Sequence, residues 1–185
     1  TTGIAGWTDD DVQALAATQV AALTTTQMGA LSTTALAALS GSQVAMLSIS
    51  QLRGLSSTQV AALSADGIAG LSAAALVGLA TSQMGQMSAE QVSSLSEEQI
   101  AALSTVQMAA LKVSQVASLS ATQVAALSTT QLKALSMTQM GGLSTEALGA
   151  LDGATLAGLS TIQVKGLTST GLAALGTGQI SALTT

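Results

Sequence analysis

The sequence predicts an all-α protein: a solenoid or superhelical coil of short capped helices, with one helix in each eight-residue repeat. Three observations predict this fold: two apolar registers with a period of eight, a Ser/Thr-to-Gln spacing typical of helix caps, and separation of acids from bases within the repeat. A compact β-solenoid is the alternative, because short Thr-rich repeats also build that fold. Residues 1–185 are expected to form a single repeat array of 23 octapeptides, close to L-S-T-T-Q-V-A-A.

The apolar registers argue against both a strand and one long helix. Every eighth residue from Trp7 to Leu183 is large and apolar, and a second apolar register runs from Ile4 to Ile180. The two registers are three and then five residues apart, whereas residues on one face of a strand have even separations. A continuous helix would rotate the apolar stripe by about 80° per octad. One short helix per octad remains, broken after the Leu.

The polar residues supply a start signal for each helix. Ser or Thr usually follows the Leu, and Gln usually lies three residues later, which is the spacing of a capping box. In such a box the hydroxyl accepts the third amide of the helix and the Gln side chain returns to the cap amide. Examples are Ser40 with Gln43, Ser56 with Gln59, Ser104 with Gln107 and Ser128 with Gln131.

The charges fit the same frame. All acidic residues lie between the expected N-cap and the third helical position: Asp9, Asp10, Asp11, Asp66, Glu90, Glu97, Glu98, Glu146 and Asp152. Arg53, Lys133 and Lys165 lie near the helix end, and only Lys112 occupies a cap position. Because the helix dipole favours acids at the N-terminus and bases at the C-terminus, this distribution supports the helix. Glycine gathers between the two apolar positions, where it would let backbones approach closely and would loosen each helix end.

Single octads cannot fold alone, since isolated helices of this length are unstable in water. Successive octads must therefore stack, with the two apolar registers lining a shared interior. The number of octads in one turn does not follow from the sequence. Trp7, in place of the first Leu, is expected to close the end of the coil.

Composition excludes several functional classes. The four cations are scattered and the net charge is −5, which argues against nucleic-acid binding. The mean hydropathy is positive at +0.58, but Ser, Thr or Gln interrupts nearly every octad, so a transmembrane segment is not expected. The sequence shows no basic-then-apolar signal peptide, which is expected of a mature product or a fragment. The chain has no His or Cys, and so lacks the common nucleophile–base pairs.

Each candidate site has a simpler structural explanation. Asp9-Asp10-Asp11 could suggest Ca²⁺, and Glu97-Glu98 the same, but both runs fit the first turn of a helix. Lys112 near Ser114 is a weak nucleophile signal. The methionines are expected to fill the core: Met28, Met84, Met108 and Met140. No catalytic, cofactor-binding or metal-binding residue is therefore predicted, and no cofactor.

Octads such as those in Leu127–Leu143, LSTTQLKALSMTQMGGL, resemble the octapeptide-repeat segments of very large secreted bacterial proteins of the adhesin-like, "haem utilisation/adhesin" type, many of them type I secreted. The resemblance covers nearly the whole chain and implies an extracellular, elongated structural segment; it transfers no functional residue. A weaker likeness to TAL-effector DNA-binding repeats fails, because Pro, the second helix and the basic charge are missing.

The sequence therefore favours a non-enzymatic structural protein, an extracellular spacer or a filament- or matrix-forming subunit of a bacterial cell surface. Self-association into a filament or array is the expected partner interaction, with cell-surface components as further candidates. The alternative is a binding module that presents a regular Ser/Thr face to ice or a polysaccharide. Capping explains the same hydroxyls without a ligand.

Overall fold

The computed structural model describes residues 3–183, and over these residues the chain is all-helical, with no strand. The predicted fold class is therefore confirmed, and the β-solenoid alternative is wrong. The chain folds as two compact units, Thr1–Leu95 and Ser96–Thr185. The octad register continues in the sequence from one unit into the next.

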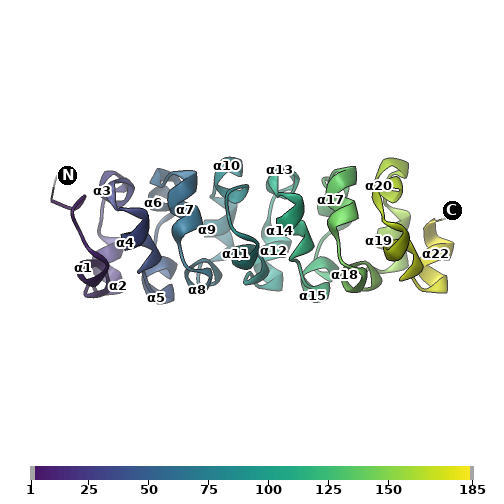
Figure 1. Ribbon diagram of the computed structural model, residues 1–185, viewed down its shortest axis with the longest axis horizontal. Coiled ribbons are helices and arrows are strands. Elements are labelled where there is room, and N and C mark those ends of the chain that lie inside the picture. Colours follow the sequence, from purple (N-terminus) through teal and green to yellow (C-terminus); the bar gives the residue numbers. More distant parts are fainter. Residues whose placement is uncertain (1–2, 184–185) are drawn as a thin grey trace. The chain divides into compact units, whose positions relative to one another are not determined.

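Eleven short helices lie in the described part of the first unit, which Figure 1 draws in purple to teal. Their bounds are α1 Asp9–Gln13, α2 Ala17–Ala21, α3 Thr25–Ala30, α4 Thr33–Ala37, α5 Gly41–Ala45, α6 Ile49–Gly54, α7 Ser57–Ala62, α8 Ala65–Ala69, α9 Ala73–Val77, α10 Thr81–Met84 and α11 Ala89–Ser93.

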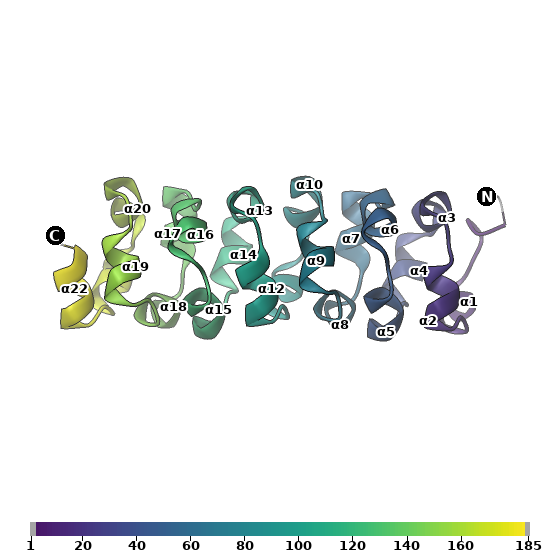
Figure 2. The ribbon, with the colours of Figure 1, turned by 180° about the vertical axis from the view of Figure 1, so that it is seen from behind.

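The second unit contains the remaining eleven described helices, drawn in teal to yellow (Figures 1 and 2). Their bounds are α12 Glu97–Ala102, α13 Thr105–Ala110, α14 Val113–Ala117, α15 Ala121–Ala125, α16 Thr129–Lys133, α17 Met137–Gly142, α18 Thr145–Gly149, α19 Gly153–Ala157, α20 Thr161–Gly166, α21 Ser169–Ala173 and α22 Thr177–Leu183.

The helices follow the predicted octads with one exception. The octad that ends at Trp7 forms a turn over residues 3–6 instead of a helix, so the expectation of one helix in every octad fails there. Gly3 takes the position that Gln occupies in most other octads, and it brings no side chain to return to a cap amide.

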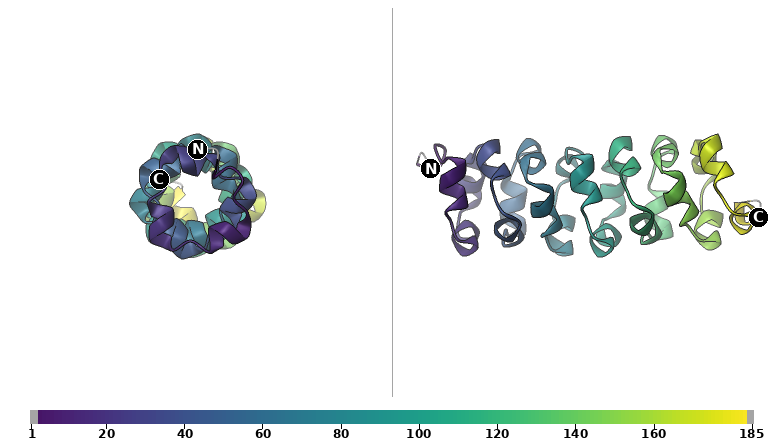
Figure 3. Two further views of the ribbon diagram at one scale, coloured as in Figure 1. Left: turned by 90° about the vertical axis from the view of Figure 1, so that its left-hand side faces the viewer. Right: turned by 60° about the horizontal axis from the view of Figure 1, so that its bottom comes forward.

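Within each unit, helices pack on the helix three octads further along, so that three octads make up one turn of that unit. In the first unit α3 packs on α6 and α5 on α8; in the second, α14 packs on α17 and α17 on α20. Seen end-on, the purple and blue helices of the first unit surround an interior (Figure 3). The number of octads in one turn, three, is the quantity that the sequence alone did not predict.

The two apolar registers fill that interior. In the second register most side chains are almost completely buried, as Val60 and Met84 in the first unit and Met108 and Leu132 in the second illustrate, each 0% exposed, whereas Leu172 and Ile180 are 37% and 46% exposed. The Leu register closes the helix ends and is also buried, for example Leu111. The predicted core is therefore confirmed, methionines included.

Small residues let successive turns approach closely, as predicted. A Cβ added at Gly166 would collide with the carbonyl of Met137, 29 residues earlier, and one at Gly54 would lie 3.2 Å from the Cβ of Thr25. No described glycine ends a helix in the left-handed conformation, because no described residue has a positive φ, and the loosening of helix ends by glycine stays a prediction. The helices end instead when the Leu turns extended, as at Leu111 with ψ 142°.

Candidate functional site

The start of each helix is built as the sequence predicts, and Ser128 at the start of α16 is representative. Its hydroxyl accepts the N–H of Gln131 at 3.3 Å, and the Oε1 of Gln131 accepts the N–H of Ser128 at 2.9 Å. The two bonds satisfy amides that the first turn would otherwise leave without partners. Complete capping boxes of this kind recur in both units, for example at Ser48, Ser88 and Ser136.

The amide nitrogen of the same glutamine has a second role, which joins one turn to the next. Nε2 of Gln131 donates to the carbonyls of Ile100 at 3.1 Å, Ala101 at 3.1 Å and Leu103 at 2.8 Å. These carbonyls lie at the end of α12, in the preceding turn. Gln131 is only 4% exposed, so its amide bridges two helices inside the protein.

The bridge repeats with a constant sequence separation, and we call the set of these contacts the glutamine ladder. Each Nε2 donates to carbonyls 28 and 31 residues earlier, or 28 and 30 for Gln59. The first unit contributes Gln43, Gln51, Gln59, Gln83 and Gln91, and the second contributes Gln131, Gln139, Gln163 and Gln179.

Sequence reasoning found the capping role of these glutamines and missed the ladder. A signal was present, because a capping box accepts Glu as readily as Gln, and the dipole favours an acid in the first turn. Fifteen octads nevertheless carry Gln at this position and none carries Glu. The preference indicates that an N–H donor is needed in addition to the oxygen acceptor.

The acidic run Asp9-Asp10-Asp11 forms the first turn of α1, as the simpler explanation predicted. The Oδ2 of Asp11 accepts the backbone N–H and the hydroxyl of Thr8, both at 2.9 Å. The hydrogen bond from the backbone of Thr8 lowers the pKa of the Asp11 carboxyl. Among the described residues, no group of His, Cys, Asp or Glu is arranged to hold a metal ion.

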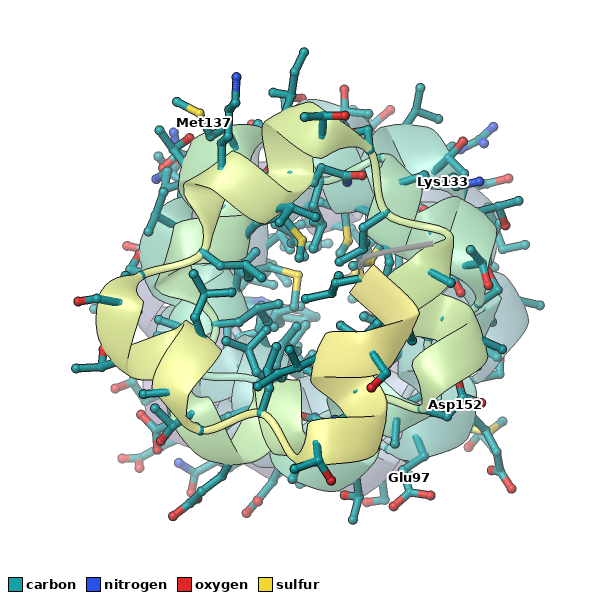
Figure 4. The ribbon with its side chains drawn as sticks, turned by 90° about the vertical axis from the view of Figure 1, so that its right-hand side faces the viewer. Glu97, Lys133, Met137 and Asp152 are labelled. Atoms are coloured by element: carbon teal, nitrogen blue, oxygen red, sulfur yellow. The ribbon has the colours of Figure 1, made fainter. Side chains whose placement is uncertain are left out.

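The other charged residues also lie at the helix positions that the sequence predicted. Glu97 and Glu98 occupy the first turn of α12 behind Ser96, and Lys133 and Lys165 lie in the last turns of their helices. Asp152 is itself an N-cap and accepts the N–H of Thr155 at 2.7 Å, which lowers its pKa. In the second unit the side chains of Glu97, Lys133, Met137 and Asp152 point outward, away from the interior (Figure 4).

The remaining candidates are Lys112 and Trp7. Lys112 occupies a cap position without a side-chain cap bond, and its backbone N–H donates to Oε1 of Gln115 at 2.6 Å. Trp7 is half-buried beside a shallow surface hollow that Thr8, Asp9, Asp10 and Thr34 also line. No described helix is long and apolar enough to cross a membrane.

The fold and the ladder define an α-helical repeat protein with solenoid-type contacts between neighbouring turns. Residues 108–145 and 148–185 match the family model described as the ALTTAQ repeat, and the chain is similar to that family over these two stretches. The repeat name can be followed in the sequence at residues 126–131, which read ALSTTQ. No curated protein shows significant similarity to the chain.

Proposed function

We propose that this chain is a non-enzymatic structural protein, an extended spacer or filament-forming subunit at the surface of a bacterial cell. The observation that carries the proposal is the glutamine ladder, which links turn to turn by the same contact in both units. A contact that depends only on the neighbouring turn lets an array lengthen by whole turns without a new core. The extracellular location rests on the resemblance to secreted bacterial repeats.

The polar groups of the repeat support a structural role over a catalytic one. Hydroxyls of the cap positions accept helix N–H groups, and the buried Gln side chains are engaged between backbone groups. Among the described residues, no buried side-chain N or O atom is left without a hydrogen bond. The polar chemistry of the repeat is thus used to hold its own backbone.

A length experiment tests the spacer proposal. A second copy of residues 113–136, one whole turn of three octads, is inserted after Ser136, and the particle is measured by small-angle X-ray scattering. The maximum dimension should grow by roughly 10 Å, the distance between packed helices, and the free energy of unfolding should rise. A flexible Gly/Ser insert of equal length is the control, because it adds no stacked turn. An unchanged dimension with the octad insert would contradict the proposal.

The location is tested separately on intact cells that produce the chain. Protease added outside the cells should cleave the chain while a cytoplasmic marker stays whole. Protection of the chain until the cells are lysed would argue against a surface role and would leave the spacer geometry untouched.

Binding of ice or a polysaccharide by a Ser/Thr face has weaker support. Hydroxyl pairs do recur at the helix starts, for example Ser120 with Thr122 at 3.0 Å. Three octads further along, however, the partner of Ser144 is Glu146, so the row is interrupted. Measurable thermal hysteresis at high protein concentration would revive this alternative.

A further inference from the structure

One row of helices in the second unit, formed by α14, α17 and α20, carries large apolar side chains on its outer surface. Val113 is 44% exposed, Met137 is 46% exposed and Ile162 is 66% exposed. They occupy the first or second helical position, where most octads carry Ser, Thr, Ala or Gly. Neither position belongs to an apolar register, so the core does not account for these three side chains.

The three side chains belong to helices that contact one another in successive turns. Helix α17 packs on α14, and α20 packs on α17. A Cβ added at Gly142 of α17 would lie 2.8 Å from Cγ1 of Val113, and one added at Gly166 of α20 would lie 2.8 Å from Cγ of Met137. Because glycine brings no side chain to these two joints, the apolar surface continues from one turn to the next.

The outward position of these side chains is independent of the end of the chain. Val113 and Met137 lie in helices on which a further turn packs. Val106 occupies the same second helical position as Ile162, but in α13, on which α16 packs, and it is 65% exposed. A side chain at that position therefore faces solvent with a following turn in place.

The same row carries positive charge and no negative charge. Lys112 at the start of α14 and Lys165 at the end of α20 are both exposed, and the octads of the three helices contain no Asp or Glu. We call the exposed residues Lys112, Val113, Met137, Ile162 and Lys165 the basic row. A partner that suits this row is acidic at two places and offers small side chains between them.

A second row of the same unit, formed by α12, α15 and α18 in contact, has the opposite charge. Glu97 and Glu98 lie in the first turn of α12, and Glu146 lies in the first turn of α18. The octads of these helices contain no Lys or Arg. The exposed side chains of α15 between them are small, as Thr122 and Ala125 illustrate. We call Glu97, Glu98 and Glu146 the acidic row.

The two rows match in the spacing of their charges. The lysines of the basic row lie in helices two turns apart, α14 and α20, and the acids lie in helices two turns apart, α12 and α18. The middle turn is uncharged in both rows, because α17 presents Met137 there and α15 presents small side chains. Figure 4 shows Met137 and Glu97 on different sides of the second unit, so one copy can offer the two rows to two neighbours.

We infer that copies of this chain pack side by side, with the basic row of one copy on the acidic row of the next. The inference rests on the proposed function as a filament- or matrix-forming subunit, and it names a second copy as the partner. The contact is heterologous, because each copy contributes a different surface, so repeated packing extends into open sheets or bundles. An anionic lipid surface suits the row less well, because the chain as a whole has a net charge of −5 and a fluid surface has no spacing to match.

A single contact of this kind should be weak. Three helices, each about 8 Å long and about 10 Å apart, offer less surface than the roughly 800 Å² per partner of a standard interface. We therefore expect a dissociation constant on the order of 0.1 mM for single chains.

Sedimentation velocity of the full 185-residue chain over rising concentration tests the inference by charge exchange. Lys112→Glu with Lys165→Glu makes both rows acidic. Glu97→Gln with Glu98→Lys and Glu146→Lys makes both rows basic. Each variant alone should associate at least about tenfold more weakly than the wild type, because like charges then face each other. An equimolar mixture of the two should recover the association, since each variant supplies the row that the other needs.

Two matched pairs of single variants separate the row from the rest of the surface. Lys165→Glu should weaken association, whereas Lys133→Glu, at the same helical position in α16 and outside both rows, should not. Ile162→Thr should lower the association constant about fourfold. Val106→Thr, at the same helical position and equally exposed, should leave it unchanged. Helical circular dichroism of each variant verifies that it folds.

Three results would overturn the side-by-side contact: a wild-type chain that stays monomeric up to about 1 mM, a mixture that associates no better than its two components, or equal losses within each matched pair. Binding to phosphatidylglycerol vesicles that the two lysine changes abolish, without association between copies, would overturn it in favour of a lipid surface. None of these results would remove the proposed spacer role, which the length experiment tests and which needs no contact between copies.

Discussion

Octads that carry glutamine at the third helical position differ from those that carry Ala or Gly there, although both kinds form a helix. At Gln131 the side chain caps its own helix and reaches three carbonyls of the preceding turn. At Ala147 the helix α18 starts from Ser144 alone, whose hydroxyl accepts the N–H of Ala147 at 3.1 Å. A helix therefore forms without the glutamine, whereas the hydrogen bonds from Nε2 to the preceding turn require it.

Other octads have the glutamine but lack the hydroxyl at the cap position. Ala16, Ala80, Lys112 and Gly176 offer no cap hydroxyl, and in each of these octads Gln Oε1 still accepts the cap N–H. Among the described helices, none lacks both the cap oxygen and the glutamine. Each described helix start thus has at least one of the two features, and many have both, as at Ser128 with Gln131.

The largest effect should come from converting a ladder amide into a carboxylate. Gln131→Glu keeps the cap acceptor but places a buried negative charge against the carbonyls of Ile100, Ala101 and Leu103. We expect a loss of about 3 kcal/mol or more in the free energy of unfolding, measured in urea. The loss should shrink in acid, where the introduced carboxyl gains a proton and can donate.

The neighbouring change Thr130→Glu is the control for that variant. Thr130 is exposed in the first turn of the same helix, where an acid suits the dipole, so its effect should stay within about 0.5 kcal/mol. Equal losses for the two variants would mean that added charge, and not the lost donor, destabilises the chain.

Removal of a cap hydroxyl should distinguish the two kinds of octad. Ser144→Ala leaves α18 without any side-chain cap, and we expect it to cost about 1–2 kcal/mol. Ser128→Ala leaves Gln131 on the cap amide, as Ala80 with Gln83 does in the wild type, and it should cost about 0.5 kcal/mol. Urea unfolding of both variants measures the difference, and equal costs would show that Gln131 does not compensate for the lost cap hydroxyl.

Adding the missing glutamine should have a smaller effect of opposite sign. Ala147→Gln supplies an acceptor for the backbone N–H of Ser144 and a ladder donor, both of which this octad lacks, and a gain of about 1 kcal/mol is expected. Ala147 is buried as the ladder glutamines are, so the added side chain lies between the turns. Glu at the same position provides the comparison: Ala147→Glu should lower stability. Stabilisation by both side chains would show that capping alone, without the ladder, accounts for the gain.

The sequence predicted the individual helix far better than the stacking of helices. Cap residues such as Ser128, the acids of the first turn and the buried registers all follow from interactions within one octad, which local spacing records. The ladder joins residues that are 28 and 31 positions apart in the sequence. Because every octad carries the same pattern, the sequence has no period longer than eight residues that would show which octads lie on one another in successive turns. The preference for Gln over Glu at the third helical position was the one feature within a single octad that indicated the ladder.

The smallest effect concerns Asp152, the N-cap residue of α19, whose cap oxygen belongs to a carboxylate instead of a hydroxyl. The N–H of Thr155 donates to it at 2.7 Å and lowers its pKa in the folded chain. A folded-state pKa below the unfolded value of about 3.9 gives stability that is fully present above that pH and is lost as pH falls through the folded pKa. Asp152→Asn and Asp152→Ser both retain a cap acceptor without this titration, so each should lose less stability than the wild type between neutral pH and roughly pH 3. Urea unfolding at both pH values measures the difference. If all three chains lose stability equally, the Asp152 cap contributes nothing to the acid response, and carboxylate and hydroxyl caps are equivalent in this repeat.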